Sequence, residues 1–210
     1  MKNKVDYSLY LVTNSNNKTN EEFLKIIEES ILGGATIVQT REKAISTRDF
    51  YNLAIEVKKI TDSYDIPLIV NDRIDVAIAI DADGVHVGQN DLPADIVRTI
   101  IGDDKILGVS AATVEEAKKA EKDGADYIGS GAMYPTETKK STCISMDYLK
   151  KIVDGVNIPI VAIGGLNENN IDSKLINTGI KGISIVSAIM NSNNPKIASE
   201  LLKKKFHHMN

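Results

Sequence analysis

The chain has few cysteines and no long hydrophobic run. Its only cysteine, Cys143, cannot form an intramolecular disulfide, which agrees with a reducing compartment and predicts a cytoplasmic protein. No run approaches the roughly 20 apolar residues that are needed to span a bilayer. The apolar stretch near the first residues contains Ser8 and is too short for a secretory signal. We therefore expect no association with a membrane.

A basic excess is also missing. The 25 lysines and arginines against 29 aspartates and glutamates give a formal net charge of -4. A general nucleic-acid surface normally shows a basic excess, so we expect no nucleic-acid partner and only a local cationic site. With 210 residues, 42% of them hydrophobic, the chain is long enough for one substantial core and short for two ordinary domains. We expect residues 1–210 to form a single domain.

Short apolar runs alternate with amphipathic stretches along the chain, which predicts parallel strands joined by right-handed helical crossovers. The expected strands are 7–13, 35–39, 67–70, 84–87, 106–110, 126–130, 158–163 and 182–186. The expected helices are 19–32, 47–63, 73–80, 93–101, 114–122, 146–153, 169–177 and 195–206.

Eight strand–helix units predict an α/β fold, a single (β/α)8 TIM barrel, although such barrels typically have ~250 residues. An open doubly wound sheet is the alternative, and it usually has a glycine-rich turn after its first strand. Residues 11–20, LVTNSNNKTN, contain no glycine. The barrel is therefore preferred, and polar clusters at the carboxyl ends of its strands are where its active site is expected.

The first such cluster follows the second expected strand. In an extended segment alternate residues face the same way, so Gln39, Arg41 and Lys43 would share one face. An amide and two fixed cations suit a diphosphate. An ordinary surface charge run explains this cluster equally well when it is considered alone.

Two aspartates follow the third and fourth expected strands. Mg2+ usually takes one or two protein carboxylates and completes its octahedron with water and phosphate oxygens, a pattern that Asp72 and Asp91 fit. Each alone is more simply explained as a helix N-cap, and Asp91-Leu92-Pro93 resembles a helix start. Their pairing beside a cationic cluster favours the metal.

Further polar groups follow the sixth, seventh and eighth expected strands. The loop Pro135–Lys139 offers two hydroxyls and an ammonium, which can hold oxyanions of two substrates. Gly164-Gly165 and Val186-Ser187 fall where barrels frequently bind a phosphate. Two plain helix-start turns are the weaker alternative for these last two.

The three histidines give no convincing general base. His86 lies inside an expected strand, where packing is the simpler role, and His207 and His208 lie in the terminal tail. No serine–histidine or cysteine–histidine arrangement suggests covalent catalysis.

The chain closely resembles the thiamine phosphate synthase family over nearly its whole length. The motifs that carry the resemblance are LYLVT, QTREK, VNDR, GVHVGQNDLP, GVSAAT, YPTETKK, VAIGGL and ISIVSAI. The resemblance implies a transferase, a thiamine-phosphate diphosphorylase, that joins a pyrimidine methyl diphosphate to a thiazole phosphate and releases diphosphate. Both partners are small molecules, and the resemblance leaves a homo-oligomer open.

The resemblance also implies roles for individual residues. Those expected to contact the pyrimidine diphosphate are Gln39, Arg41, Lys43, Asn71, Ser110 and Lys139, of which Arg41, Ser110 and Lys139 would be catalytic. Those expected to hold the thiazole phosphate are Thr136, Thr138, Gly164, Val186 and Ser187. Asp72 and Asp91 would hold the Mg2+ cofactor.

The family is understood to react dissociatively, so that diphosphate leaves first and the thiazole nitrogen captures a pyrimidine-stabilised carbocation. Such a path needs its leaving-group charge neutralised and needs no strong protein base. One departure is Ala112, where family members often carry histidine. A related thiazole tautomerase, an isomerase on the same barrel, is the nearest alternative, but it would use a histidine near position 112. A silent barrel that only binds a phosphorylated ligand would leave the two aspartates without a purpose.

Overall fold

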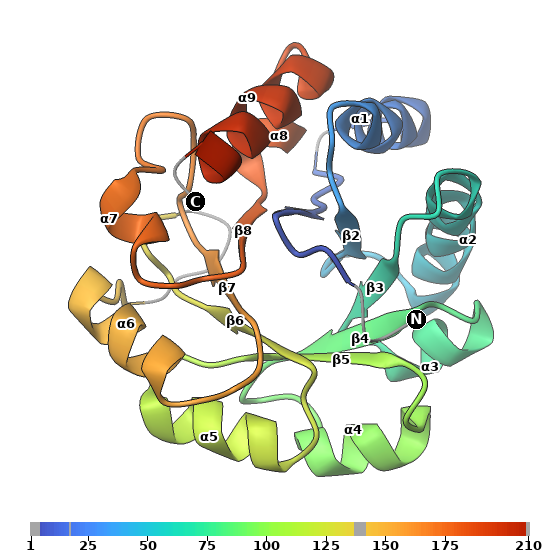
Figure 1. Cartoon of the computed structure of the whole chain (residues 1–210). Helices are drawn as coiled ribbons and strands as arrows, with labels where there is room; N and C mark the ends of the chain where they lie inside the picture. Colours follow the sequence, from blue (N-terminus) through green and yellow to red (C-terminus); the bar gives the residue numbers. More distant parts are fainter. Residues whose placement is uncertain (1–4, 17, 137–141, 209–210) are drawn as a thin grey trace.

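A computed structural model describes residues 5–16, 18–136 and 142–208 (Figure 1). Its eight strands form a closed barrel in chain order, and each strand is parallel to its neighbours, including β1 to β8. The strands are β1 (Leu9–Val12), β2 (Ile37–Thr40), β3 (Leu68–Asn71), β4 (Gly84–Val87), β5 (Ile106–Ser110), β6 (Tyr127–Ser130), β7 (Ile160–Ile163) and β8 (Gly182–Ile185). The predicted (β/α)8 barrel is thereby confirmed.

The helices surround the barrel, as Figure 1 shows. They are α1 (Asn20–Leu32), α2 (Thr47–Ser63), α3 (Ile74–Ala79), α4 (Ala94–Ile101), α5 (Val114–Lys122), α6 (Met146–Asp154), α7 (Ser173–Ile176), α8 (Ser187–Met190) and α9 (Pro195–His208). Two of them, α1 and α5, begin with a capping box, formed by Thr19 with Glu22 and by Thr113 with Glu116. None of the helices in the described ranges is long and apolar enough to cross a membrane.

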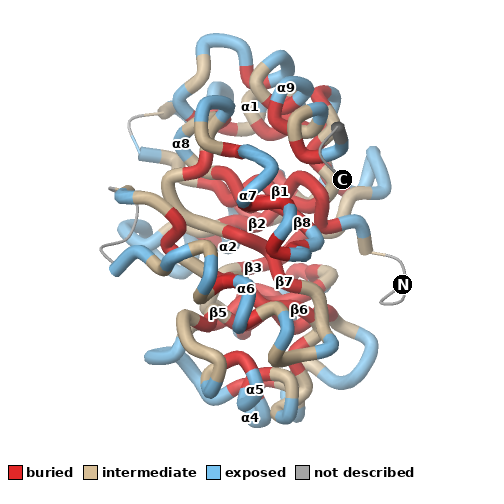
Figure 2. The backbone as a smooth tube through the Cα atoms, turned by 60° about the vertical axis from the view of Figure 1, so that its left-hand side comes forward, coloured by how far each residue is buried: buried red, intermediate tan, exposed pale blue. Residues whose placement is uncertain are grey.

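Buried side chains form two separate apolar clusters because successive residues of a strand point to opposite faces. The larger cluster joins the outer faces of the strands to the helices, and Figure 2 shows this buried layer between exposed helix surfaces. The smaller cluster fills the barrel itself and consists of Tyr7, Tyr10, Val12, Ile37, Ile69, Ile106, Tyr127 and Val161. The barrel interior is therefore packed, with no open pore, and a ligand has to bind at one of its ends.

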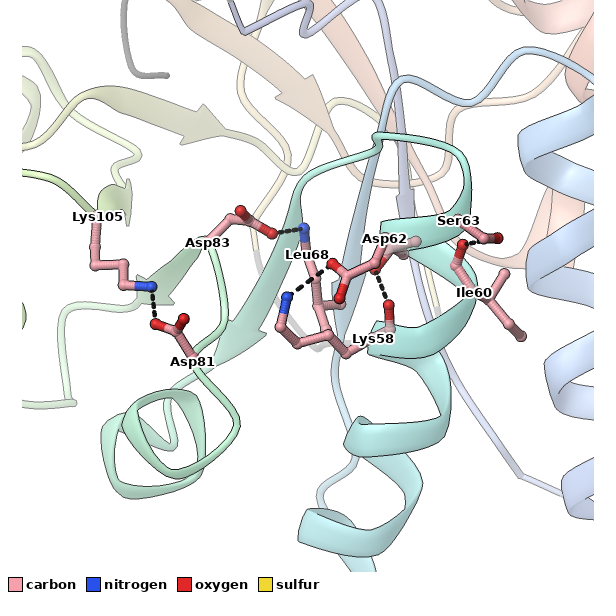
Figure 3. A network of polar contacts seen from close by, with 9 residues as sticks. Lys58, Ile60, Asp62, Ser63, Leu68, Asp81, Asp83 and Lys105 are labelled. Carbon is pink, nitrogen blue, oxygen red and sulfur yellow. Dashed lines mark hydrogen bonds and ion pairs between the residues drawn. The ribbon is translucent and has the colours of Figure 1, made fainter.

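The amino ends of the strands are tied together by aspartates. Asp83, directly before β4, accepts a hydrogen bond from the backbone N–H of Leu68 at the start of β3 (2.9 Å; Figure 3). Asp126, directly before β6, accepts one from the N–H of Leu107 in β5 (2.8 Å) and a second from Arg98 (2.6 Å). The same kind of contact, from an aspartate before one strand to a backbone N–H of the preceding strand, thus occurs twice and fixes the strand register at this end.

One expected helix is much shorter than the sequence pattern indicates. Residues 169–177 were expected to be helical, but α7 covers only Ser173–Ile176. The side chains of Asn167 and Asn170 bond to backbone N–H groups at positions 169 and 167, both at 2.9 Å. Such bonds offer the backbone an alternative to the helix, so the helix begins only after its N-cap, Asp172.

Candidate active site

The predicted site residues of β2 separate at the end of the strand. Gln39 points into the barrel, where it is 4% exposed and its Nε2 donates to the hydroxyl of Tyr10 (2.7 Å). Because β2 ends at Thr40, strand alternation does not extend to Arg41 and Lys43. Both follow the strand at the carboxyl end of the barrel, so Gln39 lies below them.

Glu42 and Arg41 differ in their surroundings. The Glu42 carboxylate accepts hydrogen bonds from Thr13 Oγ1 (2.9 Å) and the backbone N–H of Ser15 (3.1 Å), which holds the loop after β1. The backbone N–H of Arg41 donates to the same Thr13 hydroxyl (3.1 Å), while its guanidinium bonds to none of the described residues. Arg41 is thus a half-buried cation with donors available at the mouth of the barrel.

Lys43 forms an ion pair with Asp72, the residue after β3. The Asp72 side chain is only 16% exposed, and its backbone has a φ of 59°, which turns the chain sharply at the strand end. Beside it, Asn71 donates from Nδ2 to the backbone oxygen of His86 (3.3 Å). The structure therefore brings together three predicted residues, two for the diphosphate and one for the metal.

Asp91 follows β4 and does not cap a helix. The N-cap position of α4 is Pro93, with no side-chain cap bond, and α3 likewise has none. Asp91 instead accepts the backbone N–H of Gly88 through Oδ2 (2.7 Å) and closes the turn after the strand. The helix-cap explanation is therefore wrong for both Asp72 and Asp91.

The two aspartates suit a cation that takes few protein ligands. Among the described residues, the Asp72 carboxylate is contacted only through Oδ2, by Lys43, and the Asp91 carboxylate only through Oδ2, by Gly88. One carboxylate oxygen of each therefore remains available. Among the described residues no group of three or more histidine, cysteine, aspartate or glutamate side chains could hold a metal by itself. This donor set fits Mg2+, which is commonly bound by one or two carboxylates together with substrate phosphate and water.

The glycine pair after β7 lies directly against the loop after β6. A Cβ on Gly164 would come within 2.6 Å of Ala132, and one on Gly165 within 2.7 Å of the Pro135 oxygen. Both glycines have positive φ, 101° and 66°, which other residues adopt only with strain. The pair is thus required for the close approach of the two loops, whatever it binds, and Thr136 follows at the same place, half-buried.

Val186 and Ser187 form the junction of β8 with α8. Val186 is the N-cap residue of this short helix, and Ser187, its first residue, is exposed. A surface hollow of about 490 Å³ is lined by both Gly165 and Ser187. A larger one, about 650 Å³, lies between α2 and α3 and includes none of the predicted site residues. Thr138, expected at the thiazole phosphate, and Lys139, expected at the pyrimidine diphosphate, lie outside the described residues.

Sequence analysis missed a series of hydrogen bonds across the barrel interior. The series begins with the bond between Gln39 and Tyr10 described above. It continues between the hydroxyls of Tyr10 and Tyr127 (2.7 Å) and then between the Tyr127 hydroxyl and His86 Nδ1 (2.9 Å). His86 Nε2 in turn contacts the Ser110 hydroxyl at 2.9 Å. These five residues, on five different strands, are called the polar relay below. It links Gln39 and Ser110, two residues predicted to contact the same substrate.

Burial strongly affects the tyrosines of the polar relay. The pKa of Tyr127 is raised well above its ordinary value, first by loss of solvation and then by Tyr10. The pKa of Tyr10 is likewise raised by burial, although its hydrogen bonds with Tyr127 and Gln39 oppose the shift. Both therefore remain neutral hydroxyls at ordinary pH.

Two glycines inside strands are the sequence signal that could have indicated the polar relay. A Cβ on Gly108 would lie 2.2 Å from the ring of Tyr127 and 2.4 Å from His86 Nδ1. One on Gly129 would lie 3.1 Å from His86 Cε1. Glycine within a strand often marks such a close approach. His86 was expected to serve packing; it is indeed buried, but both of its ring nitrogens are hydrogen-bonded.

Comparisons with known proteins agree on one family. Residues 9–189 match the family model described as thiamine monophosphate synthase. The chain is 59% identical over 209 residues to a thiamine-phosphate synthase of Methanobrevibacter smithii, covering 99% of both chains. It is 55% identical over 212 residues to one of Clostridium botulinum, covering 100% of this chain and 99% of the relative.

Solved structures give the same result. The thiamine phosphate pyrophosphorylase from Pyrococcus furiosus superposes with a TM-score of 0.88 at 38% identity, with 98% of each chain covered. A geranylgeranylglyceryl phosphate synthase from Thermoplasma acidophilum, at 13% identity and a TM-score of 0.71, shares the fold alone.

Proposed function

The chain belongs to the thiamine monophosphate synthase family, and from this premise we propose how its site works. The protein is a transferase that condenses a hydroxymethylpyrimidine diphosphate with a thiazole phosphate to give thiamine phosphate and diphosphate. The observation that carries the proposal is the set of cations and carboxylates that follow the neighbouring strands β2, β3 and β4 at their carboxyl ends: Arg41, Lys43, Asp72 and Asp91. Full-length relatives with this name support it.

In the reaction, the bond between the pyrimidine methylene carbon and the diphosphate oxygen breaks, and its electron pair leaves with the diphosphate. The thiazole nitrogen then donates its lone pair to the methylene carbon and becomes positively charged. Arg41 supports this path because its guanidinium has donors available for the developing negative charge. Ser110, at the end of β5 beside His86, would hold the pyrimidine substrate in position.

The Mg2+ requirement is a proposal that the donor set of Asp72 and Asp91 supports. A bound Mg2+ would neutralise charge on the leaving diphosphate. Asp72 would have to share its carboxylate between the cation and Lys43, and its ion pair would hold Lys43 near the proposed diphosphate site. Asp91 would keep its turn-closing bond to Gly88 while its other oxygen faces the cation.

The second substrate would bind on the opposite side of the mouth. Gly164, Val186 and Ser187 follow β7 and β8, where backbone N–H groups at a helix start suit a phosphate. Thr136, in the loop after β6, would contribute to the same phosphate site. We propose a cytoplasmic protein because the single cysteine, Cys143, is exposed and unpaired.

The test mixes both phosphorylated substrates with the purified protein and follows thiamine phosphate and diphosphate, with Mg2+ and with a chelator. Equal amounts of both products with Mg2+, and almost none with the chelator, are expected. Absence of product in the presence of the metal would contradict the proposal. The tautomerase alternative receives no support from the relatives, and incubation with the thiazole substrate alone would detect any isomerisation.

A further inference from the structure

The direction of the polar relay follows from the Gln39 amide, whose Nε2 faces Tyr10, together with the number of hydrogens that each group can donate. Each tyrosine hydroxyl has one proton to donate, and neutral histidine has one N–H and one acceptor nitrogen. Gln39 donates to Tyr10, so the Tyr10 proton satisfies a bond only by pointing at Tyr127. The Tyr127 proton then points at His86 Nδ1, which makes that nitrogen an acceptor.

The same count continues to the barrel mouth. With Nδ1 unprotonated, the ring proton of His86 is on Nε2 and is donated to the Ser110 oxygen. The hydroxyl proton of Ser110 can then be donated to a group outside the polar relay. The opposite direction would require Tyr10 to donate toward the Gln39 amide nitrogen, which cannot accept, and would leave a hydroxyl unsatisfied in a barrel interior where Tyr10 is 2% exposed.

The surrounding strands are shaped to accommodate this arrangement. Gly108 and Gly129 provide the space in which His86 meets Tyr127 and Ser110, because a side chain on Gly108 would occupy the place of that contact. The backbone oxygen of Ser110 is itself held by Gln89 Nε2 (2.7 Å). Ser110 is therefore fixed from both the relay and the loop after β4.

We propose that the polar relay holds His86 in its Nε2–H tautomer and thereby presents the Ser110 hydroxyl as a hydrogen-bond donor to an acceptor atom of the pyrimidine substrate. Tyr10 and Tyr127 are positioning residues, since they act through His86 and do not face the substrate. The substrate part of this inference rests on the proposed function, whereas the tautomer does not. The site would discriminate against a pyrimidine that presents a donor at that point, because two hydrogens would then face each other.

Nitrogen NMR of the protein labelled with 15N-histidine tests the tautomer without substrate. The chain has three histidines, and replacing His207 and His208 by glutamine leaves His86 alone in the spectrum. We expect an unprotonated Nδ1 and a protonated Nε2. A protonated Nδ1, alone or together with Nε2–H, would overturn the proposal.

Tyr127→Phe removes the donor to Nδ1, so both tautomers of His86 should appear. Tyr7→Phe is the matched control, because the Tyr7 ring packs against Tyr127 with ring centroids 4.9 Å apart but is not part of the polar relay. It should leave the single tautomer unchanged. If Tyr127→Phe does not fold, Tyr10→Phe replaces it, since it keeps the contact with His86 and removes the fixed direction. An unchanged tautomer in the folded relay variant would contradict the proposal.

Kinetics then test the link to Ser110. Ser110→Ala and Tyr127→Phe should each raise KM for the pyrimidine diphosphate by roughly two- to tenfold, the value of one hydrogen bond. In the double variant, KM for the pyrimidine diphosphate should be no higher than in the single variant with the higher KM. KM for the thiazole phosphate should not change. Additive losses, or equal effects on both substrates, would overturn the positioning role. A wild-type protein that forms no product would refute the proposed function, and the NMR result would still decide the tautomer.

Discussion

Asp91 combines a structural contact and an available charge in one side chain. Its Oδ2 closes the turn after β4 through Gly88, and its other oxygen is not used by the described residues. Asparagine at this position keeps an oxygen that can accept from Gly88 but loses the negative charge. The substitution therefore separates the turn from the proposed metal contact.

We expect Asp91→Asn to reduce kcat/KM on the order of a hundredfold, because the charge that holds the cation is lost. Its free energy of unfolding should change by less than about 0.5 kcal/mol. Steady-state rates over a Mg2+ titration, together with urea unfolding, measure the two effects. Asp95→Asn in the first turn of α4 is the control and should leave the rate unchanged. A strong loss of stability without a change in Mg2+ dependence would show a structural role only.

At the residue scale, the sequence predicted residue types better than their contacts. Asp72 and Asp91 were predicted at the strand ends and lie there. The Lys43–Asp72 ion pair has no sequence pattern, because its partners lie in the loops that follow two different strands. His86 was interpreted as a packing residue because a lone histidine in an apolar strand belongs to no repeating pattern that would indicate its partners. Its partners Tyr127 and Ser110 are 41 and 24 residues away along the chain.

Elements at the amino end of the barrel serve stability and lie away from the proposed site. Asp83 bridges the start of β4 to Leu68 in β3, next to the exposed ion pair of Lys58 with Asp62 (Figure 3). In barrels of this type the active site lies at the carboxyl end, so the amino end is free to serve stability. Substitutions here should therefore affect unfolding and leave turnover intact.

Asp83→Ala should lower the free energy of unfolding by about 1–3 kcal/mol, because the partly buried N–H of Leu68 loses its acceptor. Asp62→Ala is the matched control: the Asp62 side chain, paired with Lys58, is exposed, and the change should stay within about 0.5 kcal/mol. Urea unfolding followed by circular dichroism measures both. A marked fall in kcat for folded Asp83→Ala would argue against this separation of the two ends.

Element boundaries were predictable where caps and periodicity agree. The expected helices at 47–63 and 114–122 coincide with α2 and α5, whose N-caps Ser46 and Thr113 accept from the first turn. The expectation failed at α7, where asparagine side chains compete for the backbone. Local signals thus define an element when they point the same way, and a conflict such as that of Asn167–Asn170 is decided only by the folded loop.

For the molecule as a whole, closure of the barrel places three tyrosines in one buried interior. Tyr7, Tyr10 and Tyr127 are each less than a tenth exposed, and their rings pack together with centroid distances of 4.9 Å for Tyr7–Tyr127 and 5.8 Å for Tyr10–Tyr127. Burial is the first cause that raises the pKa of each above the ordinary 10.0. No sequence pattern predicts this, because the three residues meet only when β1 and β6 face each other across the closed barrel.

These tyrosines should make the fold sensitive to alkali. Because their folded-state pKa values lie above the unfolded value, the folded protein retains protons that the unfolded chain releases, and stability is lost as the pH rises above 10. The loss should be about 1.4 kcal/mol per tyrosine for each pH unit above 10, with no effect of these groups below it. Urea unfolding between about pH 8 and 11 measures the slope, and Tyr127→Phe should remove roughly one of the three contributions. Tyrosinate absorbance provides the second check: of the seven tyrosines, these three should ionise only as the protein unfolds. Their ionisation within the folded protein near pH 10 would contradict the burial of the three hydroxyls.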